Sequence, residues 1–133
     1  MRLLLLLLLL RSAPALHAGE VSIAGAKEVV TSPIYTNSFL VSTNPGRAFK
    51  VLVHNSSAAA VWLHVFDSAT NKLAGAVPDL APKSLAANAT EGFDFDCSAL
   101  PFARGLLVAG STTDRTLTNV TDVLRITVTT GPP

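Results

Sequence analysis

Hydrophobic and polar residues alternate with a period of two over several stretches of the chain. Residues 49–54 read Phe-Lys-Val-Leu-Val-His, and residues 61–66 read Val-Trp-Leu-His-Val-Phe. This period is typical of a β-strand whose two faces meet different surroundings. We therefore predict a strand over each stretch. The short loop between them predicts that the two strands pair as an antiparallel hairpin.

Shorter strands follow, separated by clusters of turn-forming residues. The run from Gly105 to Gly110 is apolar throughout, which predicts a strand covered on both faces. Residues 75–82 carry two prolines and predict a crossing loop. The further predicted strands cover residues 84–86, 92–96, 105–110 and 123–129.

Outside the first eighteen residues no stretch shows the 3.6-residue period of an amphipathic helix. Short strands spaced by about 8–12 residues indicate a sandwich or a small barrel. The predicted fold class is all-β, a small antiparallel β-sandwich of jelly-roll or immunoglobulin-like type, with a closed barrel as the alternative. We divide the chain into a signal-peptide-like leader at 1–18, an extended N-terminal arm with short strands at 19–46, and a β-sandwich domain at 47–133.

The leader prediction rests on a positive start, eight leucines and the small residues that follow. A secretory signal has this outline, and cleavage after Ala15 or Ala18 would fit it. Eight leucines are too few to span a membrane, which takes about 20 apolar residues. The alternative is that the leucine tract extends upstream of the true start of translation.

Charge and cysteine content narrow the classes of function. Charged residues make up 14% of the chain and the net charge is +1, so the positive field that nucleic-acid binding needs is missing. Cys97 is the only cysteine, which excludes an intrachain disulfide and a zinc site built of thiolates. We expect Cys97 to be a small core residue.

Two sets of side chains could carry chemistry. His54 and His64, together with Asp67, could chelate a metal ion if the hairpin forms. Asp94 and Asp96, two apart on one strand, would lie about 6–7 Å from each other, within the range of carboxylate hydrolases. We expect neither set to form a functional site. Each imidazole should be hydrogen-bonded to nearby groups, and the strand should place Phe93 and Phe95 inward and both carboxylates in solvent.

Motifs of nucleophilic and phosphate chemistry are missing from the sequence. There is no Gly-x-Ser-x-Gly elbow, and no lysine follows the stretch from Gly105 to Gly110 as a phosphate loop requires. We predict no catalytic, cofactor-binding or metal-binding residues, no cofactor, and no enzyme activity.

Three short segments occur in an order that resembles a known group of proteins. They read Val-Phe-Asp-Ser-Ala-Thr at 65–70, Gly-Phe-Asp-Phe-Asp at 92–96, and Pro-Phe-Ala-Arg-Gly-Leu-Leu-Val-Ala-Gly-Ser-Thr-Thr at 101–113 with Thr-Leu-Thr at 116–118. In this order they resemble small β-sandwich virion proteins of tailed bacteriophages and prophages. The resemblance covers residues 47–129 and implies a particle-associated module that decorates or bridges other subunits.

Three functions follow as predictions. The first is a non-enzymatic virion protein (decoration, head or tail) whose partners are other protein subunits, through self-association or contact with particle proteins. The second is a secreted or envelope-associated, adhesin-like binding domain, favoured by the leader. The third is a small metal-dependent hydrolase, for which Asp94, Asp96 and the histidines are the starting point. We expect no nucleic-acid partner and no membrane span, and the location is virion-associated or secreted.

Overall fold

The protein is described by a computed structural model that covers residues 27–95 and 98–133. The predicted leader, Asp96 and Cys97 lie outside the described residues. The described chain is all-β, as predicted, and forms two antiparallel sheets. Its strands are β1 (Glu28–Thr31), β2 (Ser38–Ser42), β3 (Gly46–Asn55), β4 (Val61–Phe66), β5 (Lys83–Leu85), β6 (Thr90–Asp94), β7 (Leu100–Phe102), β8 (Leu106–Ser111) and β9 (Leu124–Gly131).

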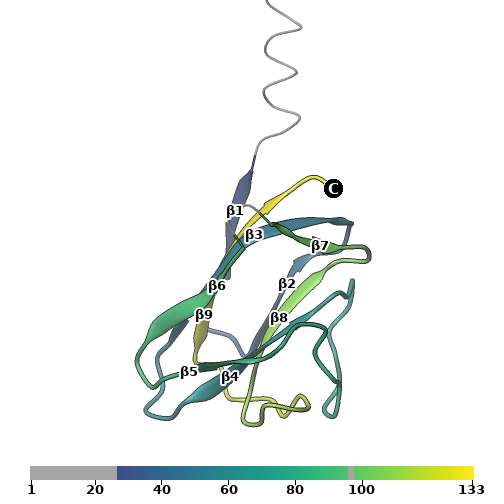
Figure 1. The fold of residues 1–133 in the computed structure, drawn as a ribbon. Coiled ribbons are helices and arrows are strands. Elements are labelled where there is room, and N and C mark those ends of the chain that lie inside the picture. Colours follow the sequence, from purple (N-terminus) through teal and green to yellow (C-terminus); the bar gives the residue numbers. More distant parts are fainter. Residues whose placement is uncertain (1–26, 96–97) are drawn as a thin grey trace, which may run out of the picture.

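The two sheets lie face to face as the layers of a sandwich (Figure 1). Sheet A has the order β1-β9-β3-β6, with β7 also paired to β3, and sheet B has the order β2-β8-β4-β5. With β7 set aside, the first strand pairs with the last, the second with the second to last, and so on inward: β1 with β9, β2 with β8, β3 with β6, and β4 with β5. This nested pairing over two sheets is the jelly-roll arrangement, one of the two predicted types.

The predicted hairpin is wrong, because its two strands belong to different sheets. β3 pairs with β6, β7 and β9 in sheet A, whereas β4 pairs with β5 and β8 in sheet B. The connection at 56–60 crosses between the sheets, and the buried side chain of Asn55 holds it in place. The Asn55 amide donates to the carbonyls of Ala59 (2.8 Å) and Ala86 (3.1 Å), and its oxygen accepts from Ser57. These hydrogen bonds thus hold a segment whose composition resembles a hairpin turn as a crossing between the two sheets.

The alternation in β3 is broken by a bulge. The register with β9 shifts between Ala48 and Lys50, so that Ala48 and Val51 both point into the core. Phe49, at the bulge, is only partly buried, and the ammonium group of Lys27 lies 4.1 Å from the centre of its ring. A bulge places two residues opposite one and re-aims the side chains around it.

The other predicted strands are confirmed in outline. β5 is a short edge strand of sheet B, β8 is buried along its whole length, and β9 closes the described chain. One strand was not predicted: Pro101 and Phe102, shortly before β8, belong to β7, which pairs with β3 in the opposite sheet. The short strands β1 and β2 of the predicted arm are hydrogen-bonded members of sheets A and B.

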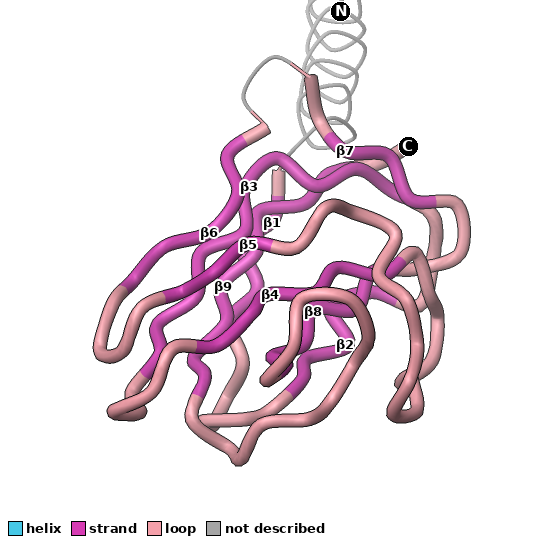
Figure 2. The backbone as a smooth tube through the Cα atoms, turned by 60° about the horizontal axis from the view of Figure 1, so that its bottom comes forward, coloured by secondary structure: helices cyan, strands magenta, loops and turns pink. Residues whose placement is uncertain are grey.

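Two hydrophobic clusters hold the fold together. The larger one lies between the sheets and includes Val51, Val53, Leu63 and Ile126, all fully buried. The smaller one lies on the outer face of sheet B and consists of Phe66, Leu107, Ala109 and Leu117. Figure 2 shows the loops that follow β4 and β8 lying over this face of the sheet.

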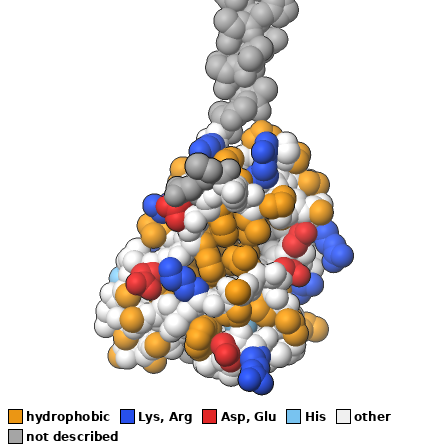
Figure 3. Space-filling view, in the orientation of Figure 1, with side chains coloured by type: hydrophobic (Ala, Val, Ile, Leu, Met, Phe, Trp, Pro, Cys, Tyr) orange, Lys and Arg blue, Asp and Glu red, His pale blue; other side chains and the backbone are white. Residues whose placement is uncertain are grey.

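The margin of the larger core reaches the surface on one side. Figure 3 shows hydrophobic side chains gathered at the centre of that face, with charged side chains around them. A small cavity of about 50 Å³ also lies at the core margin, where Leu80, Leu100 and Phe102 meet. On the neighbouring edges, the ammonium group of Lys83 on β5 donates to the carbonyl of Gly92 on β6 (2.7 Å) and ties the two sheets together. In the described part of the chain, no helix is long and apolar enough to cross a membrane.

Candidate binding surfaces

Asp67, directly after β4, binds the turn that precedes β8. Its carboxylate accepts hydrogen bonds from the backbone N–H groups of Ala103 (3.0 Å), Arg104 (2.8 Å) and Gly105 (3.4 Å). These bonds, those from Ala103 and Arg104 first, lower the pKa of Asp67 below its ordinary value, because they favour the ionised form. Two of the segments that carry the family resemblance are therefore joined to each other by Asp67.

Gly105 lies where three stretches of backbone meet. A Cβ atom here would be 2.4 Å from the carbonyl oxygen of Ser42 and 2.6 Å from that of Ser68. The backbone N–H of Ser68 also donates to the Gly105 carbonyl at 3.1 Å. Gly105 therefore allows a close approach of the three stretches, and its role is in the scaffold.

The segment at 111–118 forms a closed loop of its own. The Ser111 hydroxyl donates to the carbonyl of Thr116 (3.1 Å) and accepts from the N–H of Thr118 (2.9 Å). Leu117 between them is 2% exposed and exchanges backbone hydrogen bonds with Gly75 (2.8 Å) and Ala76 (2.7 Å). The Thr-Leu-Thr segment thus links the loop after β8 to the loop after β4.

The two histidines of interest lie in different sheets, so they cannot chelate one ion together. His54 on β3 has its Nδ1 2.8 Å from the hydroxyl of Thr90. His64 on β4 is fully buried, and its Nε2 donates to the backbone carbonyl of Thr113 at 2.9 Å. Among the residues that the structure describes, no group of three His, Cys, Asp or Glu side chains could hold a metal ion.

Burial also sets the charge state of His64. Removal from water lowers its pKa below 6.5, against the opposing effects of the Thr113 carbonyl and the charge of Asp114. The second ring nitrogen, Nδ1, is buried without a hydrogen-bond partner. His64 is therefore a neutral core residue near neutral pH, next to the ring of Phe66 at 6.1 Å between ring centres.

The predicted carboxylate pair can be traced only in part. Phe93 and Phe95 pack against the core as predicted, with their rings stacked at 6.0 Å between centres and 8° between planes. Asp94 is exposed on β6. Asp96 lies outside the described residues, so the distance within the pair stays a prediction.

No segment in the described part of the chain covers the outer face of sheet A, which we call the open face, as the two loops cover sheet B. Its central row runs across four strands and has no charged residue: Thr31, Thr127, Leu52 and Gly92 stand side by side in the register. The Thr31 and Thr127 hydroxyls are 3.1 Å apart, and Leu52 is 38% exposed. Charged residues of the same face stand in the neighbouring rows: Lys50, Asp94 and Arg125.

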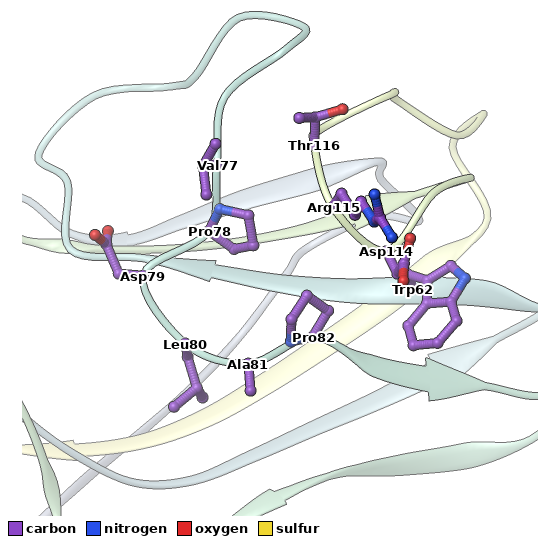
Figure 4. A pocket seen from close by; sticks show the side chains of 10 residues that line it. All are labelled: Trp62, Val77, Pro78, Asp79, Leu80, Ala81, Pro82, Asp114, Arg115 and Thr116. Carbon is purple, nitrogen blue, oxygen red and sulfur yellow. The ribbon is translucent and has the colours of Figure 1, made fainter.

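A second surface is a pocket of about 570 Å³ beside the outer face of sheet B (Figure 4). The half-buried indole of Trp62, from β4, forms one wall. Pro78 and Pro82 come from the loop after β4, and Asp114 and Arg115 from the loop after β8. In Figure 4 the side chains of Asp114 and Arg115 lie next to the indole ring.

Sequence reasoning placed Trp62 on a strand and predicted no pocket around it. The alternation placed Trp62 on one face of β4 with His64 and Phe66, which is correct. The other walls come from loops far apart in the sequence. The one available signal was the pair of prolines at 78 and 82, which indicated a fixed loop but not where it would lie.

Comparison with known proteins gives few matches. No model of a protein family matches the chain, and no curated protein matches it in sequence. Among solved structures, the coat protein of Tobacco streak virus is similar at 7% identity and a TM-score of 0.46, covering 83% of this chain and 88% of the coat protein. A structure of the coat protein dimer gives 7% identity, a TM-score of 0.45, and coverages of 84% and 87%.

Proposed function

We propose that the protein is a non-enzymatic structural module of a tailed-bacteriophage or prophage virion, and that it binds other protein subunits through the open face of sheet A. The observation that carries the binding surface is the uncharged central row of this face. The virion assignment rests on the order of the segments at 65–70, 92–96 and 101–118 in the sequence.

The composition of the open face suits contact with protein. The centres of protein interfaces are depleted of charged residues, and charges lie at the rim. Thr31, Thr127 and Leu52 form such a centre, while Lys50 and Arg125 lie toward the margin. Val29 on the edge strand β1, 65% exposed, extends the apolar part of the face.

Several polar side chains serve the fold, which also supports a structural role. Asp67 binds three backbone amides, Ser111 closes a loop, and His64 lies buried beneath Thr113. Jelly rolls occur in viral capsid and lectin domains, although a fold by itself does not fix a function.

The test is where the native protein is found. A density gradient separates particles, envelope and soluble protein, and mass spectrometry identifies the intact chain in each fraction. We expect the chain in the particle band. Its presence only in the soluble or envelope fractions would contradict the proposal.

A variant of the open face tests the surface itself. Leu52→Lys places a charge at the centre of the uncharged row, on a side chain exposed enough to leave the fold intact. We expect the variant to be lost from the particle band while its circular dichroism stays unchanged. Ala58→Lys, in the exposed crossing loop, is the matched control and should remain with the particles.

A secreted or envelope-associated binding domain is the second candidate, and the Trp62 pocket favours it. A half-buried aromatic side chain beside polar groups is typical of a ligand site. Recovery of the chain outside particles, processed after Ala15 or Ala18, would support this candidate instead.

A further inference from the structure

We infer that the pocket around Trp62 is a binding site for a neutral saccharide. The pocket lies beside the outer face of sheet B, on the opposite side of the sandwich from the open face, and it has no part in the subunit contact proposed above. Its volume of about 570 Å³ is within the range of about 300–1,000 Å³ that is usual for small-molecule sites.

The indole of Trp62 provides an apolar platform. The side chain is half-buried, so its ring is held by β4 while part of it faces the pocket. The C–H face of a sugar ring is apolar and fits flat against an aromatic ring, whose face carries negative charge. Pro78 and Pro82 add apolar walls on the other side of the pocket (Figure 4).

Asp114 and Arg115 provide the polar groups. A carboxylate accepts and a guanidinium donates in pairs, and adjacent hydroxyl groups of a sugar can satisfy both patterns. Their charges are opposite, so the pair adds no net charge to the pocket. Asp79, the third charged residue of the lining, has its carboxylate bound to the backbone N–H of Asp67 at 2.8 Å. The lining therefore has no excess positive charge to hold an anion, and the donors of Arg115 beside the acceptors of Asp114 suit a hydroxyl-rich ligand.

The backbone that carries these two polar side chains is held on both sides. Before Asp114, the carbonyl of Thr113 accepts from the buried imidazole of His64 at 2.9 Å. After Arg115, the carbonyl of Thr116 accepts from the hydroxyls of Ser111 (3.1 Å) and Thr113 (2.6 Å). A fixed loop loses little conformational freedom on binding, which favours affinity.

The proline loop is fixed as well. The backbone N–H of Asp79 donates to the carbonyl of Val65 (3.0 Å), and the Asp79 carboxylate accepts from the N–H of Asp67 (2.8 Å). Pro78 and Pro82 restrict the backbone on either side. Both walls of the pocket therefore exist before a ligand arrives.

A proline-rich peptide is the competing ligand, and the pocket suits it less well. Such peptides dock in grooves lined by several aromatic residues. Trp62 is the only aromatic residue among those that line this pocket. One platform is sufficient for one sugar ring but not for successive turns of a polyproline helix.

The fluorescence of Trp62 gives a direct test, because it is the only tryptophan of the chain. The probes are glucose, galactose, mannose, N-acetylglucosamine and their β1,4-linked disaccharides, added singly to the full-length protein. We expect a saturable change in emission with at least one probe, at a dissociation constant of about 0.1–10 mM. Titration calorimetry with that probe should give the same constant.

Variants of the polar groups show whether the pocket is responsible. Asp114 and Arg115 are exposed, so Asp114→Asn and Arg115→Gln should fold normally. Each is expected to weaken binding by about tenfold, since a charge-assisted hydrogen bond is lost. Arg104→Gln, an exposed arginine outside the pocket, is the matched control and should bind as the wild type does.

Three results would overturn the inference. One is no saturable change with any of the probes. Another is unchanged affinity in both Asp114→Asn and Arg115→Gln. The third is saturable binding of a decaproline peptide when none of the sugars binds.

Discussion

The outer face of sheet B is covered by two loops, whereas no segment among residues 27–95 and 98–133 covers the outer face of sheet A. On β4 the residues of both faces are buried except for half-buried Trp62, while on β3 every second residue is exposed or partly exposed. The long loops after β4 and β8 cause this difference, since they bring Leu117 onto the sheet beside Phe66. Whether the outer face of a strand is buried thus depends on the loops that fold over it as well as on the strand's own sequence.

The two faces consequently differ in what they can do. The covered face carries a second small core, and the same loops build the pocket around Trp62. The open face keeps side chains such as Leu52 partly exposed, and it is the face for which we propose a subunit contact.

The largest expected effect on stability comes from shortening Leu117, which packs on the outer face of sheet B. Leu117→Ala should lower the free energy of unfolding by about 2–4 kcal/mol, because a fully buried leucine leaves a cavity when shortened. Urea unfolding followed by circular dichroism measures this. A loss below about 0.5 kcal/mol would mean that the loop does not pack on the sheet as described.

A smaller loss is expected at the turn that positions β8. Asp67→Ala removes the acceptor of three backbone N–H groups and should cost about 1–3 kcal/mol. Asp122→Ala is the matched control, since Asp122 accepts one such bond, from Asn37. Equal losses in the two variants would contradict a special role for Asp67.

Asp67 also predicts sensitivity to acid. Its pKa in the folded protein is lowered, so its contribution is complete above the ordinary pKa of an aspartate and is lost as the pH falls through the folded value. The wild type should therefore lose stability below about pH 4. Asp67→Asn, which cannot ionise, should show a shallower fall over the same range of pH.

A still smaller effect concerns His64 beneath the cover. Its folded pKa is lowered, so the unfolded chain binds the proton more readily. Stability is complete above about pH 6.5 and declines as the pH falls below that value. His64→Gln should flatten this slope in urea melts between pH 7 and pH 5, whereas His54→Gln, at a partly exposed position, should retain it.

The smallest effect is expected on the bare face. Leu52→Ala should change the free energy of unfolding by less than about 1 kcal/mol, although it removes as many atoms as Leu117→Ala. Comparing the stability losses of Leu52→Ala and Leu117→Ala separates the effect of burial from the effect of residue type. A loss at Leu52 as large as that at Leu117 would remove the contrast between the two faces.

The sequence predicted which residues form strands better than it predicted how the strands pair. The alternation in β3 follows from burial on one side, and it is visible locally. The same period identified β4 as a strand, although both faces of β4 are buried apart from half-buried Trp62. Pairing depends on where the chain crosses between sheets, and Asn55 makes that crossing through bonds to Ala59 and Ala86. An Asn-Ser-Ser stretch has the composition of a hairpin turn, so the local signal favoured the wrong pairing.

The site was less predictable than the fold for the same reason. Trp62 could be assigned to a face, but Pro82 and Arg115 approach it only after two loops have folded onto sheet B. From the sequence, His64 was a candidate metal ligand. Its burial beneath Thr113 depends on a segment 49 residues away, so the local pattern could not show it. The surroundings of Trp62 and His64 are set by residues that are close in space but distant in sequence.

The nested pairing of strands has a consequence for the order in which the protein can fold. β9 is the central partner of both β1 and β3, so sheet A has no continuous hydrogen-bonded framework until residues 124–131 are present. Contacts between segments far apart in sequence make folding slow. During synthesis, β1 therefore has no partner strand, and β3 lacks one of its neighbours, until β9 has been made. Their apolar faces are exposed in this interval, which is when the chain has most need of a chaperone.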